Sequence, residues 1–321
     1  MTNMNAAVVT SFDQPPHYQP FEIPRPTAGE DLVDVLAVGL HPRVRSGAAG
    51  AHYTSTGTLP MIPGIDGIGQ RPDGKRIYFV ADDHVLGTMA DKALVDARRA
   101  IELPDDVDAA TVAATMNPAM SAWVALRLRV PIEPGQRVLV LGATGNAGTM
   151  AVRVAKLLGA GHVVGVGRDR DRLNALTAVG ADRVVQLTDD ADAPGKALAD
   201  AGADVDIVID YLWGKPAQHA MMALLTARSD RSRQLNWIQI GAIAGPTIEL
   251  PSVALRSANL RLQGNGQGAV SPAAYLAQLP SLVDQIKAGA IGLKPNPRAL
   301  SDVEEAWANT DRPGERTVLV P

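Results

Sequence analysis

The segment RVLVLGATGNAG, residues 137–148, constrains the fold of this chain more than any other part of the sequence. Apolar residues at 138–141 predict a buried strand, and a glycine-rich turn follows directly. A helix is predicted next, from small and apolar side chains at helical spacing at Ala147, Ala151, Val154, Ala155 and Leu158. Apolar residues 163–166 complete a strand–helix–strand unit. Such a turn gathers backbone N–H groups at the positive end of a helix, so the segment predicts a site for the diphosphate of a dinucleotide.

The turn has the spacing of a dinucleotide-binding fingerprint. Ala143, Gly145 and Gly148 occupy its three small-residue positions, with alanine in place of the first glycine. An alternative interpretation is that these small residues only allow the strand and the helix to pack closely. The flanking strands favour a binding site, because a glycine pattern is specific only inside such a unit. The predicted cofactor-binding residues of the turn are Ala143, Thr144, Gly145, Asn146, Ala147 and Gly148.

The residues after the second strand indicate which dinucleotide is bound. An NAD site usually has an acidic residue about 20 positions beyond the fingerprint, which accepts hydrogen bonds from the ribose 2′-hydroxyl. This chain has Gly167 and Arg168 there. Arg168 with Arg172, or with Arg170, can hold a 2′-phosphate, which predicts NADP(H). The alternative is that the arginines are solvated charges and that Asp169 binds the free 2′-hydroxyl of NAD(H).

Length and charge narrow the remaining possibilities. With 321 residues the chain is long enough for two domains. A formal net charge of −4 gives no indication of nucleic-acid binding, which would need a basic face. No apolar stretch approaches the ~18 residues of a membrane span, and the N-terminal residues lack a secretory pattern, which predicts a cytoplasmic protein. The chain has no cysteine, which excludes disulfides, a thiolate nucleophile and cysteine-bound zinc.

Two different patterns follow each other along the chain. An irregular antiparallel barrel is predicted first, from short apolar stretches at 6–10, 31–39, 76–80 and 92–96. A parallel sheet with helices on both faces is predicted next, from strands at 184–187, 205–212 and 236–241 alternating with helices at 192–201 and 216–227. A helix at 280–288 and a strand at 316–320 return to the first domain. The expected domains are residues 1–117 with 270–321, and residues 118–269.

Four stretches extend over most of the chain, LPMIPGIDGIG (59–69), GTMADKALV (87–95), AMSAWVALRLRVPIEPGQRVLVLGATGNAG (119–148) and GERTVLVP (314–321). Together they resemble the medium-chain dehydrogenase/reductase superfamily, in its zinc-independent quinone oxidoreductase-like branch. The resemblance implies an α/β protein with a GroES-like β-barrel catalytic domain and a Rossmann domain with a doubly wound parallel sheet. In the zinc-dependent branch a GHE triplet stands where this chain has Gly64, Ile65 and Asp66, so the resemblance implies an enzyme without a metal.

The absence of a metal limits the substrates that the resemblance implies. Hydride transfer creates negative charge on the acceptor, and without a Lewis acid the acceptor must spread that charge itself. The implied function is therefore an NADPH-dependent oxidoreductase that reduces quinones or activated C=C bonds in enones and enals. One alternative is reduction of one particular enone or enoyl thioester. Another is a non-catalytic NADPH-binding redox sensor or structural module, because the substrate-side loop departs from the family.

Residues 39–57 resemble the substrate-side loop of the family. Tyr53 is the predicted proton donor or substrate clamp. It follows the RSG motif by six residues, whereas the family tyrosine follows it by two. The alternative is that Tyr53 is a structural aromatic residue or one at the rim of the site. His41 is the second catalytic candidate and lies four residues before Arg45, where the family asparagine lies seven before. Convergence of His41, His52 and Asp66 on a metal is the alternative, but a single histidine is more often a surface or turn residue, and no metal is predicted.

Six residues are predicted to lie around the nicotinamide: Asn117, Ser121, Gly241, Ala242, Ile243 and Asn265. Ser121 aligns with a family threonine near the nicotinamide, so it is expected to bind the carboxamide or the ribose. It is also the third catalytic candidate. The alternative is that Ser121 caps the N-terminus of a helix. The residues from Gly241 onward follow a predicted strand at its carboxyl end, where open α/β sheets bind ligands.

The run YLWGK places Tyr211 and Lys215 at the YxxxK spacing of short-chain dehydrogenases. In those enzymes both residues lie on one helix, which lets the lysine lower the pKa of the phenol. Here the pair follows a strand and has Gly214 between its members, where we expect that no helix has begun. The match is interpreted as accidental.

Residues 259–264, NLRLQG, predict an edge strand that pairs across a two-fold axis, as in similar folds. A homodimer is therefore predicted. The expected partners are a second copy of the chain and a small quinone or enone, with neither nucleic acid nor a membrane.

Overall fold

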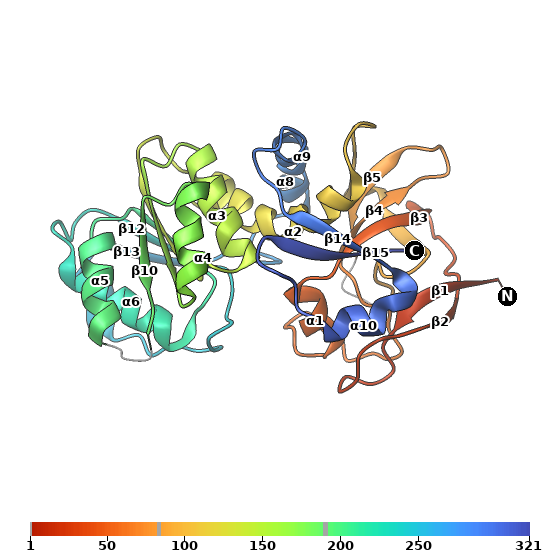
Figure 1. The fold of residues 1–321 in the computed structure, drawn as a ribbon, viewed down its shortest axis with the longest axis horizontal. Coiled ribbons are helices and arrows are strands. Elements are labelled where there is room, and N and C mark those ends of the chain that lie inside the picture. The colour runs from red at the N-terminus through yellow and green to blue at the C-terminus, as the bar shows by residue number, and fades with distance from the viewer. Residues whose placement is uncertain (1, 82–84, 189–191) are drawn as a thin grey trace. The chain divides into compact units, whose positions relative to one another are not determined.

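The computed structural model describes residues 2–81, 85–188 and 192–321. The chain divides into two compact units, the first of Met1–Asn117 with Pro272–Pro321 and the second of Pro118–Ser271. The boundary after Asn117 falls inside helix α2 (Ala109–Val124). The chain returns to the first unit at Pro272, where the sequence placed the return at residue 270. Figure 1 labels the elements of both units along the chain.

The second unit is built on a six-stranded parallel sheet in the order β10-β9-β8-β11-β12-β13. The strand order changes direction at β8, as in a doubly wound Rossmann sheet. The predicted parallel sheet is thus confirmed, with strand ends that differ by a few residues. The strands are β8 (Arg137–Leu141), β9 (His162–Gly167), β10 (Arg183–Gln186), β11 (Ile207–Asp210), β12 (Leu235–Gln239) and β13 (Leu260–Gly264).

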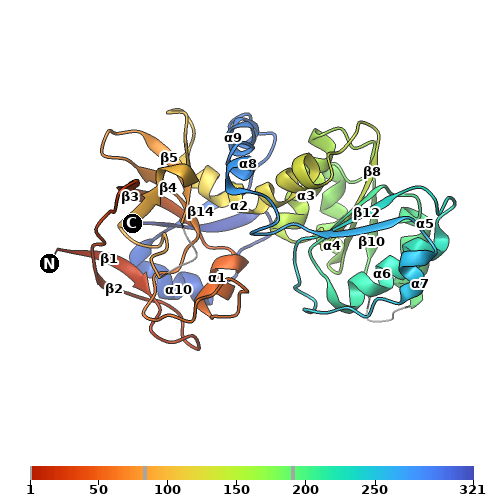
Figure 2. The ribbon, with the colours of Figure 1, turned by 180° about the vertical axis from the view of Figure 1, so that it is seen from behind.

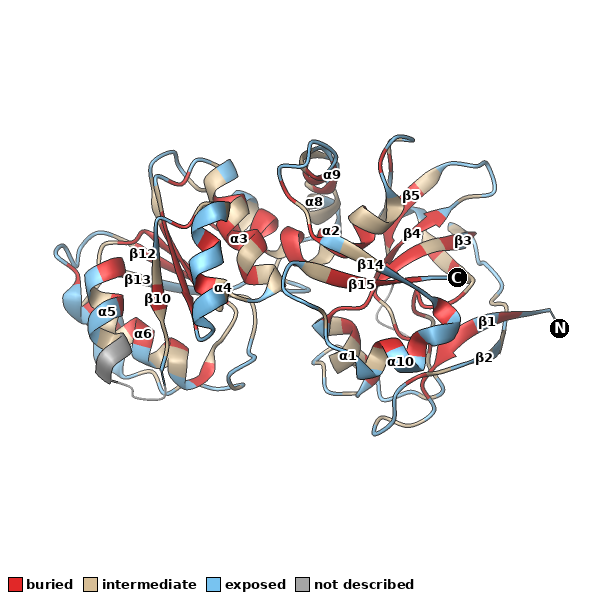
Figure 3. Ribbon diagram, in the orientation of Figure 1, coloured by how far each residue is buried: buried red, intermediate tan, exposed pale blue. Residues whose placement is uncertain are grey.

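Helices cover both faces of this sheet. In Figures 1 and 2, α3 and α4 lie side by side on one face, and α5 packs on α6 on the other. Val138, Leu139 and Val140 of β8 are fully buried, and most of the sheet is coloured as buried in Figure 3, which explains the continuous apolar strands of the sequence. The helices are α3 (Asn146–Leu157), α4 (Arg170–Ala175), α5 (Asp192–Gly202), α6 (Gly214–Ala227) and α7 (Ser252–Arg256), with short helical turns at Ala125–Arg129 (η2) and Leu176–Val179 (η3).

The first unit is mainly antiparallel. Its larger sheet has the order β14-β15-β3-β4-β5-β7, with β6 paired to β3, and β1 pairs with β2 separately. The strands are β1 (Asn3–Val8), β2 (His17–Glu22), β3 (Glu30–Gly39), β4 (Asp66–Gln70), β5 (Arg76–Val80), β6 (Lys92–Asp96), β7 (Ala100–Glu102), β14 (Lys294–Ala299) and β15 (Glu315–Val320). The helices are α1 (Pro42–Ala48), α2, α8 (Pro272–Leu276), α9 (Leu279–Lys287) and α10 (Val303–Ala308), with turns η1 (Ala97–Arg99) and η4 (Leu300–Asp302).

Helix α2 is the main element that the sequence did not predict. Only short β segments were expected before residue 117, but α2 begins at Ala109. Its residues from Val112 to Met116 are all buried, so this part of the helix has no solvent-facing side. A helix of this kind has no one-sided periodicity to recognise. Within the described ranges, no helix is long and apolar enough to cross a bilayer.

Candidate functional site

The glycine-rich turn connects β8 to α3 at the carboxyl edge of the parallel sheet. Gly142 adopts a φ of +83°, a conformation that favours glycine, and the N–H groups of Gly142 and Ala143 both donate to the carbonyl oxygen of Val166 at 2.9 Å. The chain then enters α3 with Gly145 as its N-cap, and no side chain of the described residues caps the helix. The first N–H groups of a helix have no intrahelical acceptor, so this end of α3 can bind an anion.

The two glycines of the fingerprint have different reasons to be glycine. A Cβ on Gly148 would lie 2.2 Å from the carbonyl oxygen of Gly142, so close packing of the helix on the turn requires glycine there. A Cβ on Gly145 would have no heavy atom nearer than the carbonyl oxygen of Gly142 at 3.8 Å, and its φ of −82° suits any residue. Nothing in the fold therefore requires glycine at the exposed position 145.

The end of β9 packs against the same turn. A Cβ on Gly167 would lie 2.6 Å from the Cγ2 of Thr144, so Gly167 allows the turn to lie close to β9. The predicted residues of the fingerprint and Gly167 are thus next to one another in the second unit. This contact places the following residue, Arg168, at the carboxyl edge of the sheet as an exposed side chain.

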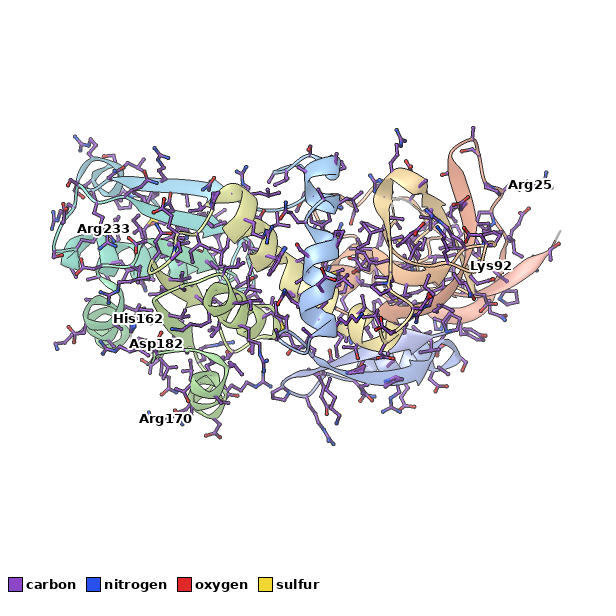
Figure 4. The ribbon with its side chains drawn as sticks, turned by 90° about the horizontal axis from the view of Figure 1, so that it is seen from above. Arg25, Lys92, His162, Arg170, Asp182 and Arg233 are labelled. Carbon is purple, nitrogen blue, oxygen red and sulfur yellow. The ribbon has the colours of Figure 1, made fainter. Side chains whose placement is uncertain are left out.

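The acidic residue after β9 is already occupied by its neighbours. Asp169 caps α4, where its Oδ1 accepts from the N–H of Arg172 at 3.0 Å, and its Oδ2 lies 3.3 Å from the Nε of the same arginine. Arg170 lies at the outer surface of the unit (Figure 4) and donates from Nη1 to the Oε1 of Gln186 at 3.2 Å. Arg172 is therefore paired with Asp169. The alternative NAD(H) interpretation requires Asp169 to bind the ribose 2′-hydroxyl, but its carboxylate already contacts Arg172 through both oxygens.

Three polar side chains meet at the other end of this edge. Ser121, inside α2, has its Oγ 2.8 Å from the phenolic oxygen of Tyr211 and 3.2 Å from the carbonyl oxygen of Pro118. Asn265, which is 8% exposed, donates from Nδ2 to the carbonyl oxygen of Ser121 at 2.9 Å. Two predicted nicotinamide neighbours, Ser121 and Asn265, are thus brought together by the fold. The alternative role of Ser121 as an N-cap is wrong, because it lies in the last part of α2.

The loop after β12 lies beside Tyr211. Gly241 donates its N–H to the carbonyl oxygen of Asp210 at 3.1 Å, and a Cβ on Gly241 would lie 2.7 Å from the carbonyl oxygen of Tyr211. Ala242 is exposed, and Ile243 is 81% exposed. An exposed isoleucine at the ligand-binding edge of a sheet offers an apolar surface to a ligand.

Asp210 and Trp213 were not predicted as site residues. The Oδ1 of Asp210 accepts from the N–H groups of Leu212 and Trp213 at 2.8 and 3.0 Å, and its Oδ2 accepts from the Nε1 of Trp237 at 3.0 Å. Burial raises the pKa of Asp210, although these three donors oppose the shift. Trp213 has a φ of +51°, which is strained for a bulky residue, so Asp210 holds a strained turn at the carboxyl end of β11.

The YxxxK pair needs one correction. Helix α6 begins at Gly214, two residues before the expected start at 216, so Lys215 does lie in the first helical turn. Tyr211 precedes the helix, and its hydroxyl contacts Ser121. The pair therefore does not share a helix, as expected. Tyr211 is nevertheless a residue of the candidate site, which the sequence interpretation missed.

The first unit contains a buried polar cluster around the second catalytic candidate. The Nε2 of His41 lies 3.0 Å from the Oδ1 of Asp66, and Tyr78 donates from its hydroxyl to the Oδ2 of Asp66 at 2.9 Å. All three residues are at most 3% exposed. The Nδ1 of His41 has no hydrogen-bond partner among the described residues, and burial together with Asp66 raises the pKa of Tyr78. An ionised carboxylate can only accept, so the Nε2 of His41 donates in this contact.

Tyr53 has the opposite environment. It lies on the loop between α1 and β4, is 72% exposed, and its ring centroid is 4.2 Å from that of His52.

Asn117 is partly buried in α2. Among the residues with described positions, no three histidine, cysteine or acidic side chains gather as metal ligands do. Of the six histidines of the chain, His84 lies outside the described residues.

Comparison with known proteins agrees with this architecture. The sequence model of a family described as zinc-binding dehydrogenase matches residues 147–231. The chain is 31% identical to the probable NADPH-dependent quinone reductase tdiC of Emericella nidulans, over 99% of this chain and 100% of the relative. Two solved structures show the same fold: a putative NADPH:quinone reductase from Bacillus thuringiensis, with a TM-score of 0.83, 18% identity and 100% coverage of both chains, and the quinone oxidoreductase from Thermus thermophilus, with a TM-score of 0.78, 24% identity and coverage of 99% of this chain and 100% of that chain. The chain therefore belongs to the quinone oxidoreductase-like family of medium-chain dehydrogenases/reductases.

Proposed function

We propose that this protein is an NADPH-dependent oxidoreductase that reduces quinones or the activated C=C bonds of enones and enals. The observation that carries the proposal is Gly145, a glycine that neither the backbone conformation nor the packing requires. A glycine at the start of α3 leaves the backbone N–H groups open to a pyrophosphate, which is the function of the second glycine in a dinucleotide fingerprint.

The residues of the second unit fit NADPH. The turn from Ala143 to Gly148 binds the pyrophosphate, and Arg168 binds the 2′-phosphate with Arg170 or Arg172 beside it. Asp169 caps α4 and pairs with Arg172, which favours NADPH because an acid held this way does not bind the 2′-hydroxyl of NADH. Ser121, Asn265 and the residues 241–243 surround the nicotinamide. When bound, the reduced nicotinamide supplies a hydride.

The substrate class follows from the residues that stand at the zinc-binding positions of the related branch. The chain has no cysteine, and Ile65 and Asp66 follow Gly64 where that branch has histidine and glutamate. Ile65 is an apolar side chain and cannot ligate zinc. The acceptor therefore stabilises the developing charge by conjugation, as quinones, enones and enals do. We propose that Tyr53 donates the proton that completes the reduction, with His41 as the second candidate.

Equilibrium binding of NADPH and NADH to the wild-type protein and to Gly145→Asp tests the proposal. Aspartate is a good N-cap residue, so the variant should keep or raise its melting temperature. Its carboxylate would face the pyrophosphate, and we expect NADPH to bind about 100-fold more weakly because apposed like charges cost several kcal/mol. Gly145→Asn is the matched control, since it has the same shape and no charge, and should lose much less affinity.

Turnover is measured by NADPH oxidation with a panel of quinones, enones and enals. We expect tighter binding of NADPH than of NADH and turnover with at least one conjugated acceptor. Equal or tighter NADH binding would contradict the assignment of the coenzyme. Tight NADPH binding without turnover on any member of the panel would favour the redox-sensor alternative.

A further inference from the structure

Tyr211 lies in the middle of the carboxyl edge of the parallel sheet. It follows β11, which lies between β8 and β12, and its N–H donates to the carbonyl oxygen of Leu141 at 3.1 Å. Glycines flank it on both sides, because a Cβ on Gly142 would lie 3.3 Å from the Cβ of Tyr211 and one on Gly241 would lie 2.7 Å from its carbonyl oxygen. Ligands of open α/β sheets bind in the crevice outside this edge. Tyr211 is therefore placed between two loops that a dinucleotide would contact.

The backbone of Tyr211 is held in place by the strained turn that follows it. Asp210 accepts from the N–H groups of Leu212 and Trp213, and Trp213 keeps a φ of +51°. Strain of this kind persists only where the surroundings over-determine it, and it is concentrated at ligand-binding sites. The hydroxyl of Tyr211 therefore contacts Ser121 from a backbone that is held in one conformation.

The hydrogen bonds around Ser121 have a definite direction. The carbonyl oxygen of Pro118 can only accept, so the hydroxyl proton of Ser121 points to it. Tyr211 then donates to the Ser121 Oγ across 2.8 Å, and burial raises the pKa of this phenol, which keeps its proton available. A hydroxyl oxygen has two lone pairs, and Tyr211 uses one of them. The other lone pair of Ser121 is left to accept a hydrogen bond from a ligand.

We propose that Tyr211 is a positioning residue that holds the Ser121 hydroxyl as an acceptor for the amide N–H of the nicotinamide carboxamide. The protein therefore prefers a coenzyme that has this amide to one that lacks an N–H donor there. The inference rests on the proposed function, because it requires NADP(H) at this edge of the sheet.

The test compares dissociation constants for NADP⁺ and for 3-acetylpyridine adenine dinucleotide phosphate, whose acetyl group has no N–H. Calorimetry measures both without turnover. We expect the wild type to prefer NADP⁺ by roughly three- to tenfold, the range that one neutral hydrogen bond provides. Ser121→Ala should remove the preference, Ser121→Thr should keep it, and Tyr211→Phe should reduce it to about twofold by freeing the Ser121 hydroxyl to rotate.

The double variant separates positioning from a structural effect. If Tyr211 acts through Ser121, then Tyr211→Phe should change nothing further in the Ser121→Ala background. Tyr18→Phe, an exposed tyrosine of β2 in the first unit, is the matched control and should behave as the wild type. Melting temperatures confirm that each variant is folded.

Several results would overturn the inference. A Tyr211→Phe protein with the wild-type preference would do so, and so would an equal loss of affinity for both coenzymes, which would point to ribose binding or to a packing role. Equal binding of both coenzymes by the wild type would overturn this inference alone. Failure of the wild type to bind either coenzyme would overturn the proposed function with it.

Discussion

The two residues proposed as proton donors differ in how far their side chains are exposed to solvent. His41 is 2% exposed and is held by Asp66, whereas Tyr53 is 72% exposed on its loop. A donor must come within hydrogen-bond distance of the substrate oxygen or carbon that it protonates. Tyr53 can do so from the surface of the first unit, while His41 first needs an opening of the buried cluster that it forms with Asp66 and Tyr78. Both assignments stay predictions, and Tyr53 is the one to test first.

Replacing Tyr53 with phenylalanine removes the hydroxyl and keeps the ring. We expect kcat for a quinone to fall by about 100-fold, the lower end of what general acid catalysis contributes, with the dissociation constant of NADPH unchanged. Steady-state kinetics and coenzyme titration measure the two quantities, and Tyr18→Phe is the control. A Tyr53→Phe protein with wild-type turnover would remove Tyr53 from the mechanism.

Between β11 and α6, the turn depends on one buried carboxylate. Asp210 is fully buried and satisfies the N–H groups of Leu212 and Trp213 as well as the indole N–H of Trp237. Three donors converge on this carboxyl group, which has acceptors and no donor when it is ionised. This explains why a charged side chain is kept at the end of an otherwise apolar strand, despite the burial that raises its pKa.

The variant Asp210→Asn replaces one acceptor oxygen with an NH₂ group that must face a donor. We expect the free energy of unfolding to fall by about 2 kcal/mol, the cost of a buried polar group without a partner. Denaturant unfolding followed by tryptophan fluorescence measures the loss. Asp171→Asn, which changes an exposed acid of α4, should stay within about 0.5 kcal/mol of the wild type. A similarly small effect at Asp210 would show that the turn is not held by its carboxylate.

For the molecule as a whole, strand β13 indicates how copies of the chain assemble. It is the last strand in the order of the second unit and pairs with β12. Within the described residues no strand pairs with its other side, and Leu262 on this strand is 37% exposed. A free edge is a template for another strand, and a two-fold axis pairs identical edges. We propose that two copies pair through β13 in a homodimer.

Light scattering after size-exclusion chromatography should give about twice the chain mass of 33.7 kDa. Leu262→Lys should shift the protein towards the monomer, because a lysine on an edge strand opposes edge pairing. Val320→Lys is the matched control, since Val320 is a similarly exposed apolar residue at the end of β15 in the first unit. A wild-type protein that stays monomeric at micromolar concentration would contradict the proposal.

The parts of the second unit that were predictable depend on local patterns. The apolar strand, glycine turn and helix of residues 137–158 follow one another in the chain, and the dihedral and packing requirements of Gly142 and Gly148 act within a few residues. Helix α2 was missed because its middle is buried on all sides and has no exposed polar face. The start of α6 was expected two residues too late because Gly214 was interpreted as a helix breaker, whereas it provides a φ of +59° at the first position of the helix.

By itself, the amino-acid sequence determined the Rossmann sheet, the glycine turn and the family, because each is written in contiguous residues whose periodicity and conformational limits act locally. Only the tertiary structure decided which side chains Tyr211 contacts. Its hydroxyl meets Ser121 across 90 residues, and Asn265 reaches the same serine across 144. Contacts of this kind depend on how strand ends and a helix align at one edge of a sheet, and no local pattern encodes that alignment.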